Sequence, residues 1–153
     1  AASTAEWKFA VFHHPPFSSG TNHGSHPFMQ WDFAGSGIDV VFSGHNHIYE
    51  RLESSDPSAF GGSSSSKITF FTNGVGGEDL DYLNTTSPLS GSRCQDNHYG
   101  AQRMRVVKDS MLVSEQWTIE DEDGSFLPEP KLVEKVILKK DKPALQIVNG
   151  GCQ

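Results

Sequence analysis

The stretch Ile38-Asp39-Val40-Val41-Phe42-Ser43-Gly44-His45-Asn46-His47 (IDVVFSGHNH) is a short apolar run that ends in two histidines. Its length and its β-branched residues are typical of a buried strand. Gly44 allows the chain to turn out of the sheet directly before the histidines. The prediction of the fold starts from this strand and the imidazoles at its end.

An earlier run of the same kind, residues 7–12 (WKFAVF), also ends in histidines, His13 and His14. Between the two runs, residues 27–34 (PFMQWDFA) combine closely spaced apolar side chains with a proline at the start and glycines after the end, which predicts a helix. A strand, a helix and a strand in this order favour a βαβ unit with parallel strands. The carboxyl ends of such strands share one edge and bind ligands, so the histidines are expected there.

The rest of the chain predicts mostly β-structure after a flexible interruption. Residues 54–66 (SSDPSAFGGSSSS) predict a flexible Ser/Gly surface loop. A third strand is expected at 68–72 (ITFFT), followed by a glycine turn at 73–77, a loop at 79–97, a β-hairpin at 101–107 and 111–119, and an edge strand at 133–139. The predicted fold class is α/β (α+β), with a mixed sheet and a β-rich C-terminal part.

Composition excludes several classes of partner. The 153 residues suffice for one domain, and the net charge of -7 without a cluster of lysines and arginines argues against a nucleic-acid partner. The sequence has no apolar run of about 18 residues, so no membrane span is expected.

The two cysteines, Cys94 and Cys152, do not have the spacing of a metal site. They can form one disulfide, and the sequence leaves open whether they do. Together with the glycosylation sequon Asn84-Thr85-Thr86, a disulfide would suit an extracytoplasmic or secreted protein.

Six of the seven histidines fall within the first 50 residues. In an extended chain, residues i and i+2 point to the same side, so His45 and His47 can face one point or two metal ions about 3.5–4 Å apart. Ends of neighbouring strands lie about 5 Å apart, which brings His13 within reach of the same pocket. His14 should point away from His13 if the strand continues, and is then a packing residue. Taken alone, the GHNH motif also fits a polar loop with solvated histidines.

Four segments in this order carry a family resemblance: residues 12–20 (FHHPPFSSG), 22–25 (NHGS), 42–51 (FSGHNHIYER) and 70–78 (FFTNGVGGE). They resemble the second half of a calcineurin-like metallophosphoesterase, close to the purple acid phosphatase branch. The resemblance runs from about residue 7 to residue 104. It implies a four-layer αββα sandwich that hydrolyses phosphate esters, as an acid phosphatase-like phosphomonoesterase, at a dinuclear centre of Fe, Zn or Mn ions.

The resemblance also implies roles for individual residues. His13 and His45 match ligands of one metal ion, and His47 matches a ligand of the other. His23 matches a catalytic histidine that contacts the phosphate or helps to protonate the leaving group. The role of His14 stays open.

Other polar residues and glycines near these motifs have less specific interpretations. His98 is expected in a surface loop. Glu50 and Arg51 fit a catalytic acid and a phosphate clamp, or a local structural pair. The glycines at 74, 76 and 77 resemble the rim of the family's site.

The family's Asp-containing and Gly-Asn-His motifs would precede residue 13, and they are not in this sequence. Residues 1–153 are therefore expected to be the C-terminal portion of a single catalytic domain, inactive alone. The missing N-terminal half is its expected partner, and a phosphate ester is the substrate. Half of a sandwich should expose an apolar face and a strand edge.

Two alternatives stay open. One is a non-catalytic histidine-rich module that holds a single ion such as Zn(II) or Cu(II), or a partner. The other is a structural β-rich domain in which the histidines have no role.

Overall fold

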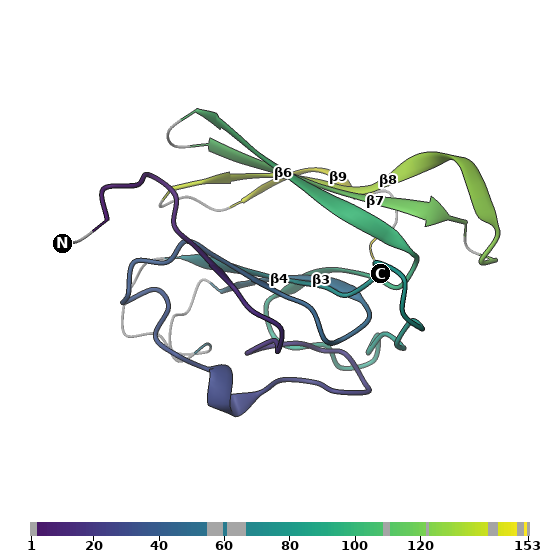
Figure 1. Cartoon of the computed structure of the whole chain (residues 1–153), viewed down its shortest axis with the longest axis horizontal. Coiled ribbons are helices and arrows are strands. Elements are labelled where there is room, and N and C mark those ends of the chain that lie inside the picture. The colour runs from purple at the N-terminus through teal and green to yellow at the C-terminus, as the bar shows by residue number, and fades with distance from the viewer. Residues whose placement is uncertain are drawn as a thin grey trace.

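The computed structural model describes residues 3–54, 60, 67–108, 111–121, 123–140, 144–149 and 152. Within these residues the chain forms two sheets (Figure 1) and one 3-10 helix, η1 (Pro27–Met29). The strands are β1 (Phe9–Val11), β2 (Val40–Ser43), β3 (Tyr49–Ser54), β4 (Ile68–Asn73), β5 (Ser92–Asp96), β6 (Gly100–Lys108), β7 (Met111–Glu120), β8 (Phe126–Lys139) and β9 (Leu145–Asn149). In the described part of the chain, no helix is long and apolar enough to cross a membrane.

The first sheet is mixed, with the strand order β1-β2-β4-β3-β5. Strands β1, β2 and β4 run parallel, with Phe9 opposite Val40 and Val40 opposite Thr69. Strand β3 runs antiparallel between β4 and β5. The expected parallel arrangement of the strands that end in histidines is therefore confirmed.

The helix predicted at residues 27–34 is wrong, because only the single 3-10 turn of η1 forms there. The Asp32 carboxylate accepts the Gly35 N–H at 2.7 Å, which stabilises a turn in competition with a helix. Phe33 enters the core while Phe28 remains 64% exposed, so the aromatic residues do not share one buried face. The α/β assignment is corrected accordingly: the described residues form a mixed sheet and an antiparallel sheet without α-helices.

The second sheet is antiparallel, with the order β6-β7-β8-β9. The hairpin predicted at 101–107 and 111–119 is confirmed as β6 and β7. The edge strand predicted at 133–139 is longer than expected and lies inside the sheet, because β9 pairs with its outer side. The loop predicted at 79–97 contains β5, and most of the loop predicted at 54–66 lies outside the described residues.

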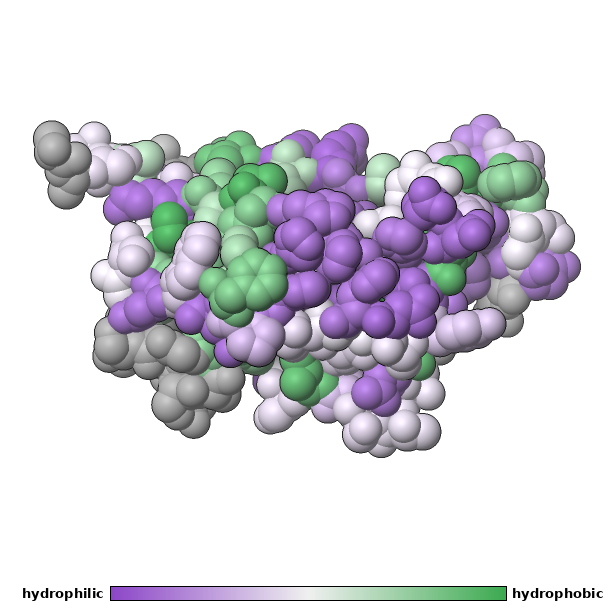
Figure 2. Space-filling model, turned by 60° about the horizontal axis from the view of Figure 1, so that its bottom comes forward, coloured by the Kyte–Doolittle hydropathy of each residue, from purple (hydrophilic) through white to green (hydrophobic). Residues whose placement is uncertain are grey.

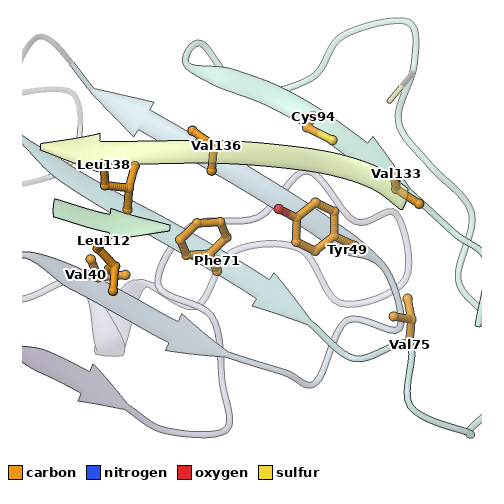
Figure 3. Packing of buried hydrophobic residues seen from close by; sticks show 9 residues of the cluster. All are labelled: Val40, Tyr49, Phe71, Val75, Cys94, Leu112, Val133, Val136 and Leu138. Atoms are coloured by element: carbon orange, nitrogen blue, oxygen red, sulfur yellow. The ribbon is translucent and has the colours of Figure 1, made fainter. Parts of the chain in front are cut away.

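The two sheets pack face to face around a buried apolar cluster (Figure 3). The cluster is Val40, Tyr49, Phe71, Val75, Cys94, Leu112, Val133, Val136 and Leu138. Cys94 of β5 and Cys152 form a disulfide, so the bridge that the sequence left open is present. It ties the end of the chain to the first sheet.

The other face of the first sheet is also covered. Phe17, Phe33 and Phe60 pack over Val41 and Phe70 in a second buried cluster. The expected exposed apolar face is therefore not found on this sheet in the described residues. An edge strand is found at β1, one of the two edges of this sheet, where Val11 is 74% exposed.

The segment that carries η1 lies at the bottom of Figure 1 and comes forward in Figure 2. On that face, hydrophobic residues gather in a patch beside a continuous hydrophilic area (Figure 2). The exposed aromatic residues Phe28 and Trp31 belong to this segment.

Candidate functional site

The candidate site lies where β1 and β2 end. The Phe12 N–H donates to the Phe42 carbonyl at 3.1 Å, and the Gly44 N–H donates to the His13 carbonyl at 3.0 Å. These bonds extend the contact between the two chain segments beyond the strands. His13 and His45 therefore leave the sheet side by side, because parallel strands end at the same edge.

His45 occupies the left-handed region of backbone conformation, with φ of 64°. Non-glycine residues rarely adopt this conformation, and they do so mostly in tight turns and at functional sites. The turn brings His45 Nδ1 to 3.0 Å from His13 Nε2 and its ring to 4.4 Å from the His14 ring. One ligand nitrogen from each of these three residues lies within 4.8 Å of the other two, and we call them the three-histidine group.

The chain leaves extended geometry directly after β1, which ends at Val11. His13 and His14 consequently stand edge to face, with ring centroids 4.9 Å apart, instead of pointing to opposite sides. The premise that placed His14 away from the site, a strand continuing through residue 14, is wrong. His14 contributes to the three-histidine group on geometric grounds.

His47 is held separately from this group. Its Nδ1 lies 2.6 Å from the Asp79 carbonyl, and its backbone N–H donates to Asp81 Oδ2 at 2.8 Å. Because a carbonyl only accepts, Nδ1 carries the proton and Nε2 keeps the lone pair. This tautomer leaves Nε2 available as a metal ligand.

The loop between β1 and η1 folds two further histidines onto His45. The His23 ring lies 4.3 Å from His45 and 6.2 Å from His47. The His26 ring lies 5.0 Å from His45 and 4.8 Å from His14. The site residues predicted from sequence, His13, His23, His45 and His47, thus lie in one region, and the structure adds His14 and His26.

The loop is anchored by buried polar groups. Glu50 Oε2 accepts the Ser19 N–H at 2.7 Å, and the His26 N–H donates to the Pro15 carbonyl at 2.9 Å. Glu50 also accepts from Ser92 and Gln95 on β5. Its carboxylate therefore joins the loop to the sheet.

Arg51, the next residue on β3, points to the opposite side, as alternation along a strand requires. It forms an ion pair with Glu134 at 2.7 Å between the two sheets. Glu50 and Arg51 thus do not form the local pair considered from the sequence, and each has a separate set of partners.

The clustered imidazoles affect one another's protonation. Burial, reinforced by His23, His14, His13 and His26, lowers the pKa of His45 to about 4. Burial, reinforced by the nearby rings of His14, His23 and His13, also lowers the pKa of His26. At neutral pH His45 is uncharged, so it offers a lone pair to an electrophile such as a metal ion.

The donor set fits a transition metal. Neutral imidazole nitrogens suit Zn, Cu, Fe or Ni ions. The three-histidine group contains no carboxylate. Among the described residues, the buried Nε2 of His26, on a ring 5.0 Å from that of His45, has no hydrogen-bond partner. A buried nitrogen of this kind fits a site that holds a polar group or an ion.

His98 lies outside the cluster. Its Nδ1 is 2.6 Å from Asp96 Oδ1, and burial raises the pKa of Asp96. The glycine turn after β4 contacts the site instead: the Gly74 N–H donates to the Ile48 carbonyl at 3.0 Å.

The part of the chain that carries the clustered histidines is similar to a known protein family. Residues 1–49 match the model of the family of calcineurin-like phosphoesterases. That range contains all six clustered histidines. A sequence comparison with curated proteins finds no match to the chain.

The fold is similar to a solved structure, GAP50, the anchor in the inner membrane complex of Plasmodium. The TM-score is 0.57 at 16% sequence identity, and the match covers 100% of this chain. The chain spans 41% of the length of GAP50. At this identity the match concerns the fold, and it shows that the same architecture occurs within a larger protein.

Sequence reasoning gave no role to His26 and left the role of His14 open. The signal that pointed to both was the crowding of histidines in the first 50 residues. Sequence spacing alone did not place them, because their positions depend on the turns at residues 13–14 and 23–26.

Proposed function

We propose that this chain forms part of a metal-dependent phosphoesterase that hydrolyses phosphate esters in the manner of an acid phosphatase-like phosphomonoesterase. The observation that carries the proposal is the convergence of His13 and His45 at the ends of two parallel strands, inside the range that matches the family model. Residues 1–153 are then a portion of one catalytic domain.

In this proposal His13 and His45 hold one metal ion and His47 holds the other. The neutral state of His45 and the fixed tautomer of His47 both support these roles. When bound, two ions of the Fe, Zn or Mn class supply the charge that polarises the phosphate and activates water. The chain's own contribution is to hold the imidazoles at fixed positions on strand ends.

His23 is the proposed catalytic residue. Its ring stacks at a tilt on His45 and is exposed, so it can contact a phosphate from the open side. A protonated imidazole there donates to a phosphate oxygen or to the departing alkoxide.

The remaining ligands are proposed to come from a preceding half of the domain, docked at the edge of β1. Carboxylates are the ligands still required, because imidazoles alone neutralise little of the charge of two cations. Two observations support this arrangement: β1 is an edge strand with an exposed Val11, and the chain spans only 41% of the length of GAP50.

The test is hydrolysis of p-nitrophenyl phosphate, with metal content measured by mass spectrometry. The chain alone should be inactive, and the chain extended by its upstream coding sequence should be active. In the extended protein, His45→Ala should lower kcat by about a hundredfold or more through loss of a metal ligand. His98→Ala, outside the cluster, is the matched control. Metal-loaded extended protein without hydrolysis would refute the proposal.

The geometry also supports a second candidate, a non-catalytic metal-binding module. The three-histidine group is assembled within this chain and contains His14, which no dinuclear role requires. Calorimetric titration of the chain with Zn(II) distinguishes the two candidates. Loss of one-to-one binding in His14→Ala, with no effect of His47→Ala, would favour the module.

A further inference from the structure

A segment that is distant from the histidines in sequence holds His47 in place. Residues 79–81 lie in the connection between β4 and β5 and contact His47 through both its ring and its backbone. The His47 ring donates to the Asp79 carbonyl, and the His47 backbone N–H donates to Asp81 Oδ2 at 2.8 Å. In return, the Asp81 N–H donates to the His47 carbonyl at 3.1 Å. The position of His47 therefore depends on this segment.

The same segment also holds the loop that carries His23. The second oxygen of the Asp81 carboxylate, Oδ1, accepts the side-chain N–H of Asn22, the residue before His23. One residue further along each segment, the Thr21 hydroxyl donates to the Tyr82 carbonyl at 3.0 Å. One carboxylate thus joins the loop of His23 to the backbone of His47.

The residue after His23 is anchored in the same region. The Gly24 carbonyl accepts the side-chain N–H of Asn46 at 3.0 Å, and the fully buried Asn46 directly precedes His47. Both sequence neighbours of His23 are therefore bonded to residues that hold or adjoin His47. The rings of His23 and His47 lie 6.2 Å apart in this arrangement.

The chemistry of these bonds requires a carboxylate at residue 81. Asp81 is only 3% exposed, and burial of a charged group costs free energy unless hydrogen bonds offset it. An ionised carboxylate accepts at both oxygens, whereas an amide accepts at one atom and donates at the other. Because Asn22 and the His47 backbone both present donors, an amide at residue 81 satisfies only one of them.

We propose that Asp81 is a positioning residue, which sets the place of His23 relative to His47 in the reaction. The inference rests on the proposed function, in which His23 contacts the phosphate and His47 holds a metal ion. His23 is exposed and lies in a loop, so its position depends on the anchoring of its neighbours. A misplacement of about 1 Å can lower the rate of a reaction by about a hundredfold.

The first experiment records NMR spectra of the purified chain. The Hε1 and Cε1 signals of His23 report its position, because the ring current of His45, whose ring lies 4.3 Å away, shifts them. Asp81→Asn turns a donor toward one of its two former partners. Asn22→Ala removes only the bond to the His23 loop and, since Asn22 is exposed, leaves the core intact. Both variants should move the His23 signals toward those of an unstructured histidine.

A double variant tests the pairing directly. Asn22→Asp combined with Asp81→Asn restores a donor and an acceptor in reversed order, so the His23 signals should return to their wild-type positions. Glu78→Gln is the matched control, because it removes the same charge from an exposed residue of the same connection. It should leave the His23 signals unchanged. Circular dichroism and urea unfolding verify that each variant is folded.

The second experiment measures hydrolysis of p-nitrophenyl phosphate by the extended protein. Asn22→Ala should lower kcat by about tenfold or more, because His23 is displaced. The metal content should stay unchanged, since the contacts of residues 79–81 with His47 remain. The double variant should recover most of the kcat that Asp81→Asn loses.

The outcomes separate this inference from the proposed function. Unchanged His23 signals in folded Asp81→Asn and Asn22→Ala overturn the inference, as does a folded double variant in which the signals do not return. A wild-type kcat in Asn22→Ala also overturns it and leaves the proposed function in place. If the extended wild type does not hydrolyse phosphate esters, the proposed function fails, and the NMR spectra alone decide whether Asp81 positions His23.

Discussion

At some positions of this chain, the close approach of two backbone segments leaves room only for glycine. Gly74 shows this best, because its Cα faces the carbonyl of Asn46 and the Cα of His47. The turn that shapes one wall of the candidate site is therefore packed directly against the loop that holds His47.

Gly74→Ala should lower the free energy of unfolding by about 1–3 kcal/mol, the usual cost of forcing extra atoms into a packed site. Gly76→Ala is the matched control, since its Cβ meets nothing within 4 Å. Urea unfolding of the two variants measures the difference. Equal stabilities would show that the turn is not packed on the histidine loop.

At the scale of elements, the outer face of the second sheet is organised around one carboxylate. Glu115 of β7 accepts from Arg103 of β6 at 2.9 Å and lies 3.0 Å from Lys135 of β8. The hydrogen bonds from Arg103 and Lys135 lower the pKa of Glu115 below its usual 4.5. These cross-strand contacts join three neighbouring strands on one face.

A carboxyl with a lowered pKa in the folded state stabilises the fold when ionised. Its contribution is fully present above the unfolded pKa near 4.5 and is lost as the pH falls through the lower folded value. Glu115→Gln should therefore be less stable than wild type at pH 7, and the gap should shrink as the pH falls below 4.5.

Unfolding curves at a series of pH values measure this gap. Glu129→Gln, an exposed glutamate on β8, should show no such pH dependence. A gap that is constant from neutral to acidic pH would contradict the assigned role of the carboxylate.

Element prediction from sequence succeeded where apolar residues dominate and failed where polar residues are buried. Strands β1, β2, β4 and the β6–β7 hairpin have local apolar patterns. Strands β3 (YERLES) and β5 (SRCQD) do not, and their polar side chains are buried only because distant partners satisfy them. Local pattern carries no information about those partners.

At the scale of the whole molecule, a buried polar network joins the two sheets. Glu134 of β8 accepts the Tyr49 hydroxyl at 2.8 Å and pairs with Arg51 at 2.7 Å, both on β3. Burial, together with the charge of Glu134, raises the pKa of Tyr49 well above its ordinary value. Each member of this network depends on the other sheet.

Glu134→Ala should cost about 3–5 kcal/mol, because it leaves the Arg51 guanidinium buried without its main carboxylate partner. Glu129→Ala, exposed on the same strand, should change stability by no more than about 0.5 kcal/mol. Chemical denaturation measures both. A loss below about 1 kcal/mol for Glu134→Ala would mean that this network contributes little to the association of the two sheets.

The disulfide between Cys94 and Cys152 closes a loop with a sequence separation of 58 residues. Cys152→Ala should lower the free energy of unfolding by about 4 kcal/mol, the loop-entropy estimate for this separation. The comparison is unfolding with and without reductant: reduction should destabilise the wild type to the level of the variant and leave the variant unchanged. If reductant does not change the free energy of unfolding of the wild type, the disulfide does not stabilise the fold.

The sequence by itself determined the parallel strands, the glycine turn, the hairpin and the region in which the histidines meet. These features follow from local apolar periodicity and from residues with restricted or unusual backbone freedom. Membership of His13, His45 and His47 in the candidate site stays a prediction, supported by their placement at one edge.

Tertiary structure alone decided the absence of an α-helix in the described residues, the buried polar strands, the disulfide and the approach of His14 and His26 to His45. The missing helix reflects the local turn in which the Asp32 carboxylate accepts the Gly35 N–H. The other features depend on contacts between residues far apart in the chain. The physical reason is that a buried polar group is stable only when another group supplies its hydrogen bonds, and pairings of distant groups leave no periodic trace in sequence.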